Sequence, residues 1–142
     1  ISRIMETVYS SEFTLNSSVC YELLSIVANV YCEAIRIDVT ETAQYTIVGN
    51  SKMKILGYAY ENNFTIFDLK KNSIERSHYI NNCNEQFRIV LHRQMNTSFI
   101  LVISTMYAFQ QGKFSIVISG PSNVSIKKIG KYFTCFISIF NQ

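Results

Sequence analysis

The stretch Glu33-Ala-Ile-Arg-Ile-Asp-Val-Thr40 decides the fold class, because its apolar and polar residues alternate strictly. Ile35, Ile37 and Val39 would face one side of an extended strand, and the polar residues between them would face the other. A period of two predicts a half-buried β-strand, whereas an amphipathic helix would repeat its apolar residues every three or four positions. The same short period returns along most of the chain.

Further segments with strand character lie on both sides of this stretch: 44–48, 52–61, 64–69, 87–92, 98–108, 113–119 and 124–129. Residues 98–108 form a nearly continuous apolar run, which predicts a central strand buried on both faces. We expect this run to form a hairpin with 113–119. Residues 22–30 fit a helix or a strand, and we favour a strand.

Turn signals separate these segments. Gly49-Asn50-Ser51 and the Gly120–Asn123 segment, which holds the only proline, predict turns. Gly57 predicts a bulge or a close approach of another chain segment. Residues 70–85 are the most polar part and predict a long surface loop. Seven to ten short strands in 142 residues indicate one all-β domain, an antiparallel β-sandwich in the jelly-roll or immunoglobulin-like range.

Composition narrows the classes of function. The chain is 48% hydrophobic, which excludes a disordered protein, and only 16% charged. Its net charge of +3 is scattered, and Lys70-Lys71 and Lys127-Lys128 are the only adjacent basic pairs, so we expect no nucleic-acid partner. No apolar run is long enough for a transmembrane helix. Because the sequence starts at Ile1, we interpret it as a mature or trimmed chain.

Cysteines and sequons indicate an extracellular, secreted glycoprotein. The four widely spaced cysteines fit two disulfides better than a metal site, and three pairings are possible. The spacing favours Cys20–Cys32 and Cys83–Cys135, without excluding the other two pairings. Four acceptor motifs for N-linked glycans each lie near an expected turn or strand start. Their asparagines are Asn16, Asn63, Asn96 and Asn123. Apart from these glycans, we expect no cofactor.

The two chain ends differ from the middle, so we divide the chain into a leader strand (1–19), a sandwich (20–130) and an apolar terminal strand (131–142). Residues 8–15 predict an amphipathic strand with Tyr9, Phe13 and Leu15 on one side. Residues 132–140 are apolar on both faces. Such a strand either completes its own sheet or pairs with another molecule. The candidate assembly residues are Val8, Tyr9, Phe13, Leu15, Phe133, Phe136, Ile137, Ile139 and Phe140.

The sequence contains no catalytic signature, and we expect no enzyme activity. No nucleophile elbow or glycine-rich phosphate loop is present. The carboxylates at Asp38, Glu41, Glu61 and Asp68 have no distinguishing spacing.

Several stretches together carry a resemblance to a known type of module. They are Glu33–Thr40, Tyr45-Thr-Ile, Gly57–Phe64, Gln86-Phe-Arg-Ile-Val-Leu, Thr97–Thr105 and Gly112–Val124. Over residues 20–130 the chain resembles a β-sandwich module of secreted invertebrate proteins that is similar to pre-peptidase C-terminal and CUB-like domains. The resemblance implies a non-catalytic extracellular module used in adhesion, matrix or surface assembly. Such modules carry an acidic cluster before the cysteine that matches Cys83, and residues 78–82 here contain no carboxylate, so calcium is not expected.

Two functions follow as hypotheses. The first is a subunit of an extracellular filament or matrix, joined to itself head-to-tail by strand complementation. The second is an adhesion module that binds carbohydrate or protein within a larger surface protein. Exposed tyrosines would stack on sugars in that case, and the candidates are Tyr58, Tyr60, Tyr79 and Tyr107.

If the terminal strand 131–142 mediates the assembly of the first hypothesis, its removal should lower the oligomeric state and change the solubility. Size-exclusion chromatography with light scattering measures the oligomer before and after truncation. An unchanged mass and solubility would contradict a role for the tail in assembly.

Overall fold

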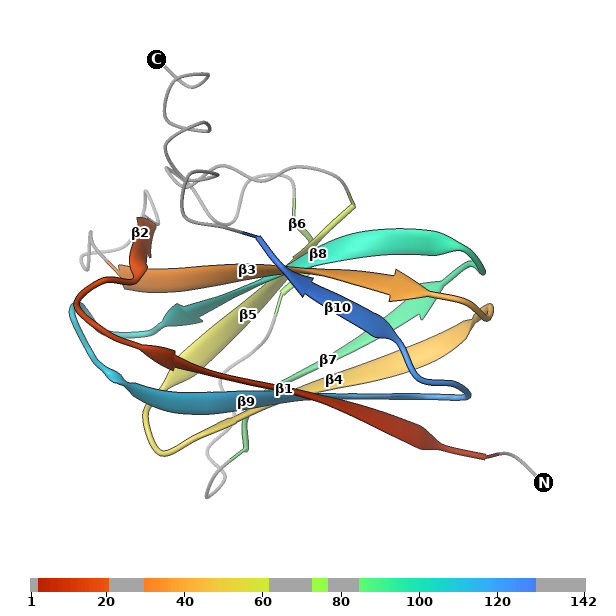
Figure 1. Ribbon diagram of the computed structural model, residues 1–142, viewed down its shortest axis with the longest axis horizontal. Coiled ribbons are helices and arrows are strands. Elements are labelled where there is room, and N and C mark those ends of the chain that lie inside the picture. Colours follow the sequence, from red (N-terminus) through yellow and green to blue (C-terminus); the bar gives the residue numbers. More distant parts are fainter. Residues whose placement is uncertain (1–2, 21–29, 62–72, 77–84, 130–142) are drawn as a thin grey trace, which may run out of the picture.

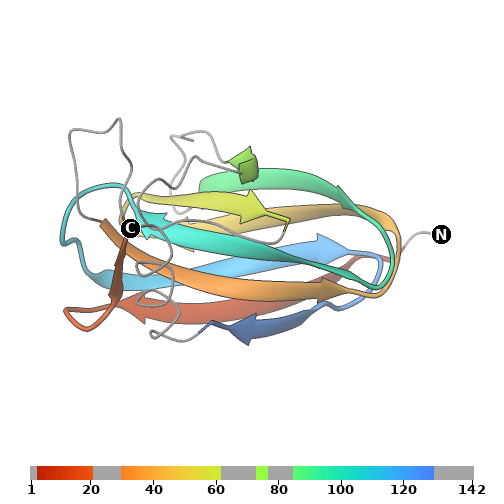
Figure 2. The same ribbon diagram turned by 90° about the horizontal axis from the view of Figure 1, so that it is seen from above.

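Two antiparallel sheets pack face to face in the computed structural model, which describes residues 3–20, 30–61, 73–76 and 85–129 (Figures 1 and 2). This confirms the predicted all-β sandwich. The four-stranded sheet has the order β1 (Met5–Phe13), β9 (Gly112–Gly120), β4 (Ala43–Ser51) and β7 (Glu85–Arg93). The six-stranded sheet has the order β10 (Ser125–Lys128), β3 (Val30–Val39), β8 (Thr97–Thr105), β5 (Ile55–Tyr60) and β6 (Ser73–Arg76), and β2 (Ser18–Cys20) also pairs with β3.

The strand order is that of a jelly roll, because most connections between the described strands cross from one sheet to the other, β2–β3 and β5–β6 being the exceptions. The orders β1-β9-β4-β7 and β3-β8-β5-β6 interleave in this way. The predicted hairpin of 98–108 with 113–119 is therefore wrong. β8 pairs with β3 and β5, whereas β9 pairs with β1 and β4. Residues 106–111 cross from one sheet to the other, and local sequence does not distinguish a crossing from a hairpin.

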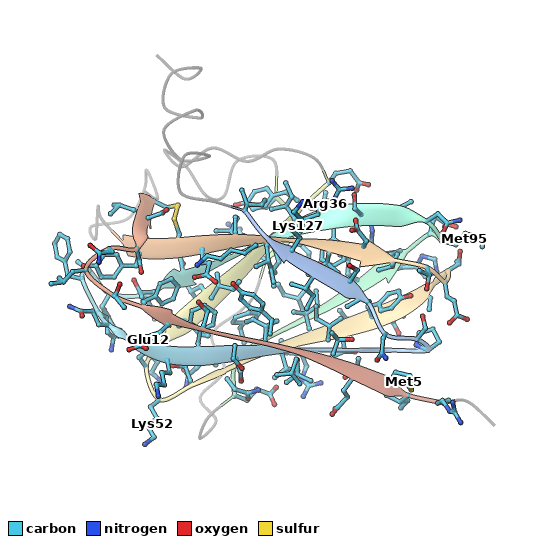
Figure 3. The ribbon with its side chains drawn as sticks, viewed as in Figure 1. Met5, Glu12, Arg36, Lys52, Met95 and Lys127 are labelled. Atoms are coloured by element: carbon cyan, nitrogen blue, oxygen red, sulfur yellow. A yellow bond between two sulfur atoms is a disulfide. The ribbon has the colours of Figure 1, made fainter. Side chains whose placement is uncertain are left out.

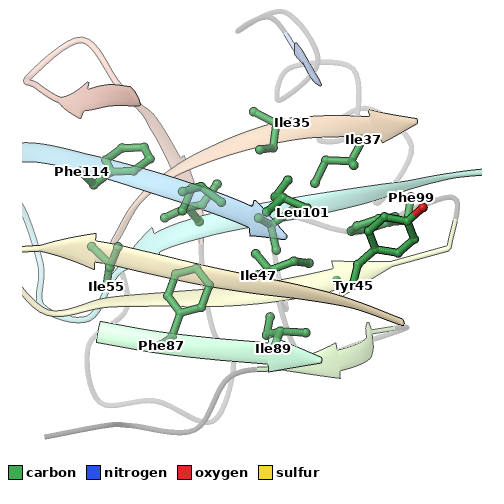
Figure 4. Close-up of a cluster of buried hydrophobic side chains, with 14 of the residues drawn as sticks. Ile35, Ile37, Tyr45, Ile47, Ile55, Phe87, Ile89, Phe99, Leu101 and Phe114 are labelled. Carbon is green, nitrogen blue, oxygen red and sulfur yellow. The ribbon is translucent and has the colours of Figure 1, made fainter. Parts of the chain in front are cut away.

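The core lies between the sheets and uses the alternation seen in the sequence. Tyr45 and Ile47 on β4 and Ile35 and Ile37 on β3 are fully buried, and Phe87 and Ile89 point from β7 into the same layer (Figure 4). Each such side chain contributes about 1.5–3 kcal/mol to the free energy of unfolding through its removal from water. A second, smaller apolar cluster, which includes the buried Val102, explains why β8 is buried on both faces as predicted.

Two strand glycines allow the core to close around one aromatic ring. A Cβ atom added to Gly49 would lie 2.1 Å from Phe87 Cε2, and one added to Gly57 would lie 2.6 Å from Phe87 Cε1. The predicted turn at 49–51 is wrong, because these residues complete β4 and the chain turns at 52–54. Gly49 is a strand residue because the ring of Phe87 occupies the place of its side chain. For Gly57 the close approach is confirmed, and its pairing with β8 runs without a bulge.

Other boundaries also differ from the sequence predictions. The expected loop at 70–85 contains β6, a short strand whose Ile74 and following residues are exposed. Glu85 at the end of that loop begins β7, and residues 70–72 and 77–84 lie outside the described residues, as do residues 21–29 and 62–69. The N-terminal strand β1 pairs with β9 over all nine of its residues, so this part of the leader segment lies within the sandwich.

We predict that Gly49→Ala lowers the free energy of unfolding by about 1–3 kcal/mol, because the new methyl group overlaps the Phe87 ring. Denaturant unfolding measures the loss. In the background of Phe87→Leu the same change should cost less, since the smaller side chain leaves room for the methyl group. Equal losses in both backgrounds would contradict the packing described for Gly49.

Candidate functional site

Three of the four sequon asparagines lie on exposed turns. Asn16 follows β1, Asn96 joins β7 to β8, and Asn123 joins β9 to β10. Asn96 has a φ of 59°, in the left-handed region that asparagine tolerates well. Asn63 lies outside the described residues. The exposed positions are compatible with glycan attachment, which remains a prediction.

One predicted disulfide is confirmed. Cys20 and Cys32 are bonded, with their Cα atoms 5.8 Å apart. The bond ties β2 to β3 beside their ladder, three residues after the turn that follows β1. Cys83 and Cys135 lie outside the described residues, so their pairing stays a prediction.

The candidate assembly residues of the N-terminal strand do not share one face. Phe13 is buried in the core, whereas Val8 on the opposite face of β1 is 59% exposed. Leu15 was predicted on the same side as Tyr9 and Phe13, but it lies in the turn after β1 and is 76% exposed. The C-terminal candidates, Phe133, Phe136, Ile137, Ile139 and Phe140, lie outside the described residues.

β1 and β7 form the two edges of the four-stranded sheet. Each has nine residues, and no described strand pairs with the outer side of either. Each neighbouring pair in this sheet is antiparallel, so β1 and β7 run in opposite directions. On the outer face, the pairing registers align Val8 with Val117 and Val117 with Val48. The sheet therefore presents two long edges beside a row of valines.

A polar cluster closes the gap between the sheets next to β1. The carboxylate of Glu33, on β3, is buried and accepts hydrogen bonds from the hydroxyls of Tyr9 and Ser11 on β1, the latter at 2.9 Å. The ammonium group of Lys128, at the end of β10, lies 3.5 Å from the same carboxylate. Burial raises the pKa of Tyr9 well above its usual range, and the Glu33 carboxylate raises it further. Glu33 thus joins strands of both sheets.

A shallow hollow of about 790 Å³ lies where the outer face of the four-stranded sheet meets the β4–β5 turn. Its lining includes Ser10 of β1, Asn50 of β4 and Ser115 of β9, which the registers place side by side. Lys52 and Lys113 are exposed at its rim. Figure 3 shows Lys52 and Glu12 at the same end of the sandwich.

Hydrogen bonds of Ser51 join the segments that line this hollow. Its hydroxyl donates to the carbonyl oxygen of Lys113 at 2.8 Å and accepts from the backbone nitrogen of Met53 at 3.2 Å. The Gln86 side-chain nitrogen donates to the carbonyl oxygen of Ser51 at 3.0 Å. These bonds join the end of β4, the β4–β5 turn, β7 and the start of β9.

The aromatic candidates for ligand stacking are only partly available. Tyr58 and Tyr60 are buried, which corrects their candidacy as exposed residues, and Tyr79 lies outside the described residues. Tyr107 is 52% exposed on the β8–β9 connection. Phe109 on the same connection is 60% exposed, has a φ of 55°, and packs edge-on against Tyr31. Sequence reasoning missed Phe109, because no local pattern reports its exposure.

The comparisons with known proteins leave the class of protein open. No protein-family model matches the sequence, and no curated protein is significantly similar to it. Across the described ranges, no three His, Cys, Asp or Glu side chains are grouped as metal ligands would be. Within those same ranges, no helix is long and apolar enough to cross a membrane.

Sequence reasoning also missed the roles of Glu33 and Ser51. Glu33 opens the alternating stretch, where its burial is not predicted because charged residues are rarely buried without partners. Its partners come from β1 and β10, which are distant in sequence. Ser51 was assigned to a turn, although its hydrogen bonds reach β9 and β7.

We predict that Tyr9→Phe lowers the free energy of unfolding by about 1 kcal/mol at neutral pH, through loss of the hydrogen bond to Glu33. Because folding raises the pKa of Tyr9 above its ordinary 10.0, its contribution is complete below pH 10.0 and is lost as the pH rises further. The stability difference between wild type and variant should therefore shrink at alkaline pH. Denaturant titrations at about pH 8 and about pH 11 measure it, and a constant difference would contradict this pairing.

Proposed function

We propose that this chain is a non-catalytic extracellular glycoprotein that assembles head-to-tail into a filament or matrix by strand pairing. In this assembly, the β1 edge of one subunit joins the β7 edge of the next. The four-stranded sheet then continues from copy to copy. A heterologous contact of this kind does not close on itself, and it produces an open filament unless the rotation between subunits forms a ring.

The geometry of the four-stranded sheet carries this proposal. β1 and β7 are equal in length and run in opposite directions. When one copy is shifted sideways along the sheet without inversion, its β1 therefore lies antiparallel to β7 of its neighbour. The alternation of the sheet is preserved across the contact. Antiparallel pairing with full-length edges provides the largest number of main-chain hydrogen bonds between subunits.

The extracellular part of the proposal is supported by the covalent chemistry of the chain. The Cys20–Cys32 disulfide is typical of oxidising compartments. The sequon asparagines Asn16, Asn96 and Asn123 lie in turns at the ends of the strands, outside the faces and edges of the four-stranded sheet. Glycans at these turns would therefore leave β1 and β7 accessible.

Single lysine substitutions test the two edges separately. Val8→Lys on β1 and Val90→Lys on β7 change exposed valines, so both variants should fold as the wild type does. A lysine in an edge strand disfavours pairing because docking removes water from its ammonium group. Each variant alone should remain monomeric, as measured by light scattering. An equimolar mixture should form dimers, since the free β7 edge of one variant can pair with the free β1 edge of the other.

Thr46→Lys is the matched control, because Thr46 lies on the same outer face but on the inner strand β4. It should leave assembly unchanged, and electron microscopy should show the same filaments as for wild type. Dimers formed by Val90→Lys alone would indicate symmetric β1–β1 pairing and contradict the head-to-tail arrangement. Monomers in the unsubstituted protein at all concentrations would exclude assembly altogether.

A further inference from the structure

We propose that the hollow at Ser51 is a binding site for an acidic carbohydrate, in which Lys52 and Lys113 pair with a sugar carboxylate. This site includes the outer-face side chain of Ser10 on β1, but not the main-chain groups that would pair in the proposed assembly. It lies on the outer face of the four-stranded sheet, at the end where β4 turns into β5.

The hollow is organised before a ligand arrives. The Ser51 hydroxyl bonds to Lys113 and Met53 on its two sides, and Gln86 bonds to the Ser51 carbonyl oxygen. Lys52 lies between Ser51 and Met53 in sequence, so its backbone is held at both neighbours. The backbone of Lys113 is held through its carbonyl oxygen. Binding would therefore order only the two long side chains, which limits its entropic cost.

The polar lining fits sugar hydroxyl groups. Ser10 and Ser115 supply hydroxyls, and Asn50 and Gln111 supply side-chain amides. These groups both donate and accept hydrogen bonds, as sugar hydroxyls do. Met53 and Phe114 also border the hollow, but both side chains are buried in the core between the sheets, so they offer a ligand little surface.

The charge at the rim favours a ligand with sparse negative charge. Lys52 and Lys113 are both exposed, and Glu12 lies opposite Lys113 in the β1–β9 register. The two lysines and one glutamate leave a single net positive charge. A saccharide with one carboxylate on alternate residues matches this balance better than a densely charged polyanion.

The position on the sheet favours a saccharide over an acidic peptide. Asn50 and Ser115 face each other on the inner strands β4 and β9, whose main-chain groups already pair within the sheet. An extended peptide gains most of its affinity from main-chain hydrogen bonds at a free strand edge, and β4 and β9 have none to offer where Asn50 and Ser115 lie. Recognition here depends on side-chain hydroxyl, amide and ammonium groups.

Calorimetric titration of the full chain tests the site with two oligosaccharides of equal length. One alternates glucuronic acid with N-acetylglucosamine, and the other contains only N-acetylglucosamine. We expect the acidic oligosaccharide to bind at least about tenfold more tightly, since its carboxylate forms charge-assisted hydrogen bonds with the lysines. The double variant K52S/K113S should lose about the same factor for the acidic sugar.

The double variant R36S/K127S is the control, because it removes the same charge from exposed positions on the other sheet (Figure 3). Its affinity should equal that of wild type. Equal binding of both oligosaccharides, no binding of the acidic one, or equal losses in the two double variants would overturn the proposal. Equally tight binding of a poly-glutamate peptide at Lys52 and Lys113 would also overturn it, in favour of an anion site without sugar recognition.

The sugar-binding proposal and the assembly proposal can be tested separately. A V8K/V90K variant blocks both strand edges and leaves the lining of the hollow unchanged. It should bind the acidic oligosaccharide as wild type does, whether or not the unsubstituted protein assembles. Loss of sugar binding in this monomeric variant would show that the ligand requires the assembly and would overturn the location at the hollow.

Discussion

The packing of Phe87 against two glycines is the constraint on which the rest of the sandwich depends. Its ring comes from β7 and occupies the space that side chains at Gly49 on β4 and Gly57 on β5 would need. β4 and β5 belong to different sheets, so a single ring sets how closely the two layers approach. Close-packed interiors do not absorb extra atoms without displacement of their neighbours.

The side chains of β1 and its outer main-chain edge differ in their partners. Beside β1, the inner gap is closed by the Glu33 carboxylate with Tyr9, Ser11 and Lys128, which satisfy a buried charge that would otherwise be costly. The main-chain edge of β1 has no such closure within the described residues. Side-chain contacts therefore hold β1 in its own subunit, while its outer main-chain groups stay available for pairing with another strand. This combination makes strand addition compatible with a subunit that keeps its own β1.

In the two proposals, the hollow and the strand edges of one sheet serve different kinds of recognition. Edge pairing uses main-chain groups and is insensitive to most side chains. The proposed binding at the hollow depends instead on the lysines, hydroxyls and amides around Ser51. Both features arise from the jelly-roll order, which places β9 between β1 and β4 and thereby brings Ser10, Ser115 and Asn50 into one row.

Local patterning determined the strands themselves. The alternation from Glu33 to Thr40 and the apolar run at 98–108 predicted β3 and β8, because the period of two is a property of each strand alone. The spacing of Cys20 and Cys32 also indicated their bond. Tertiary structure alone decided which strands are neighbours, so the expected hairpin of β8 and β9 gave way to a crossing between sheets. It also decided that Gly49 is a strand residue, that Glu33 is buried and that Ser51 joins four segments. Each of these depends on contacts between residues far apart in the chain, and such contacts leave no periodic signal in the sequence.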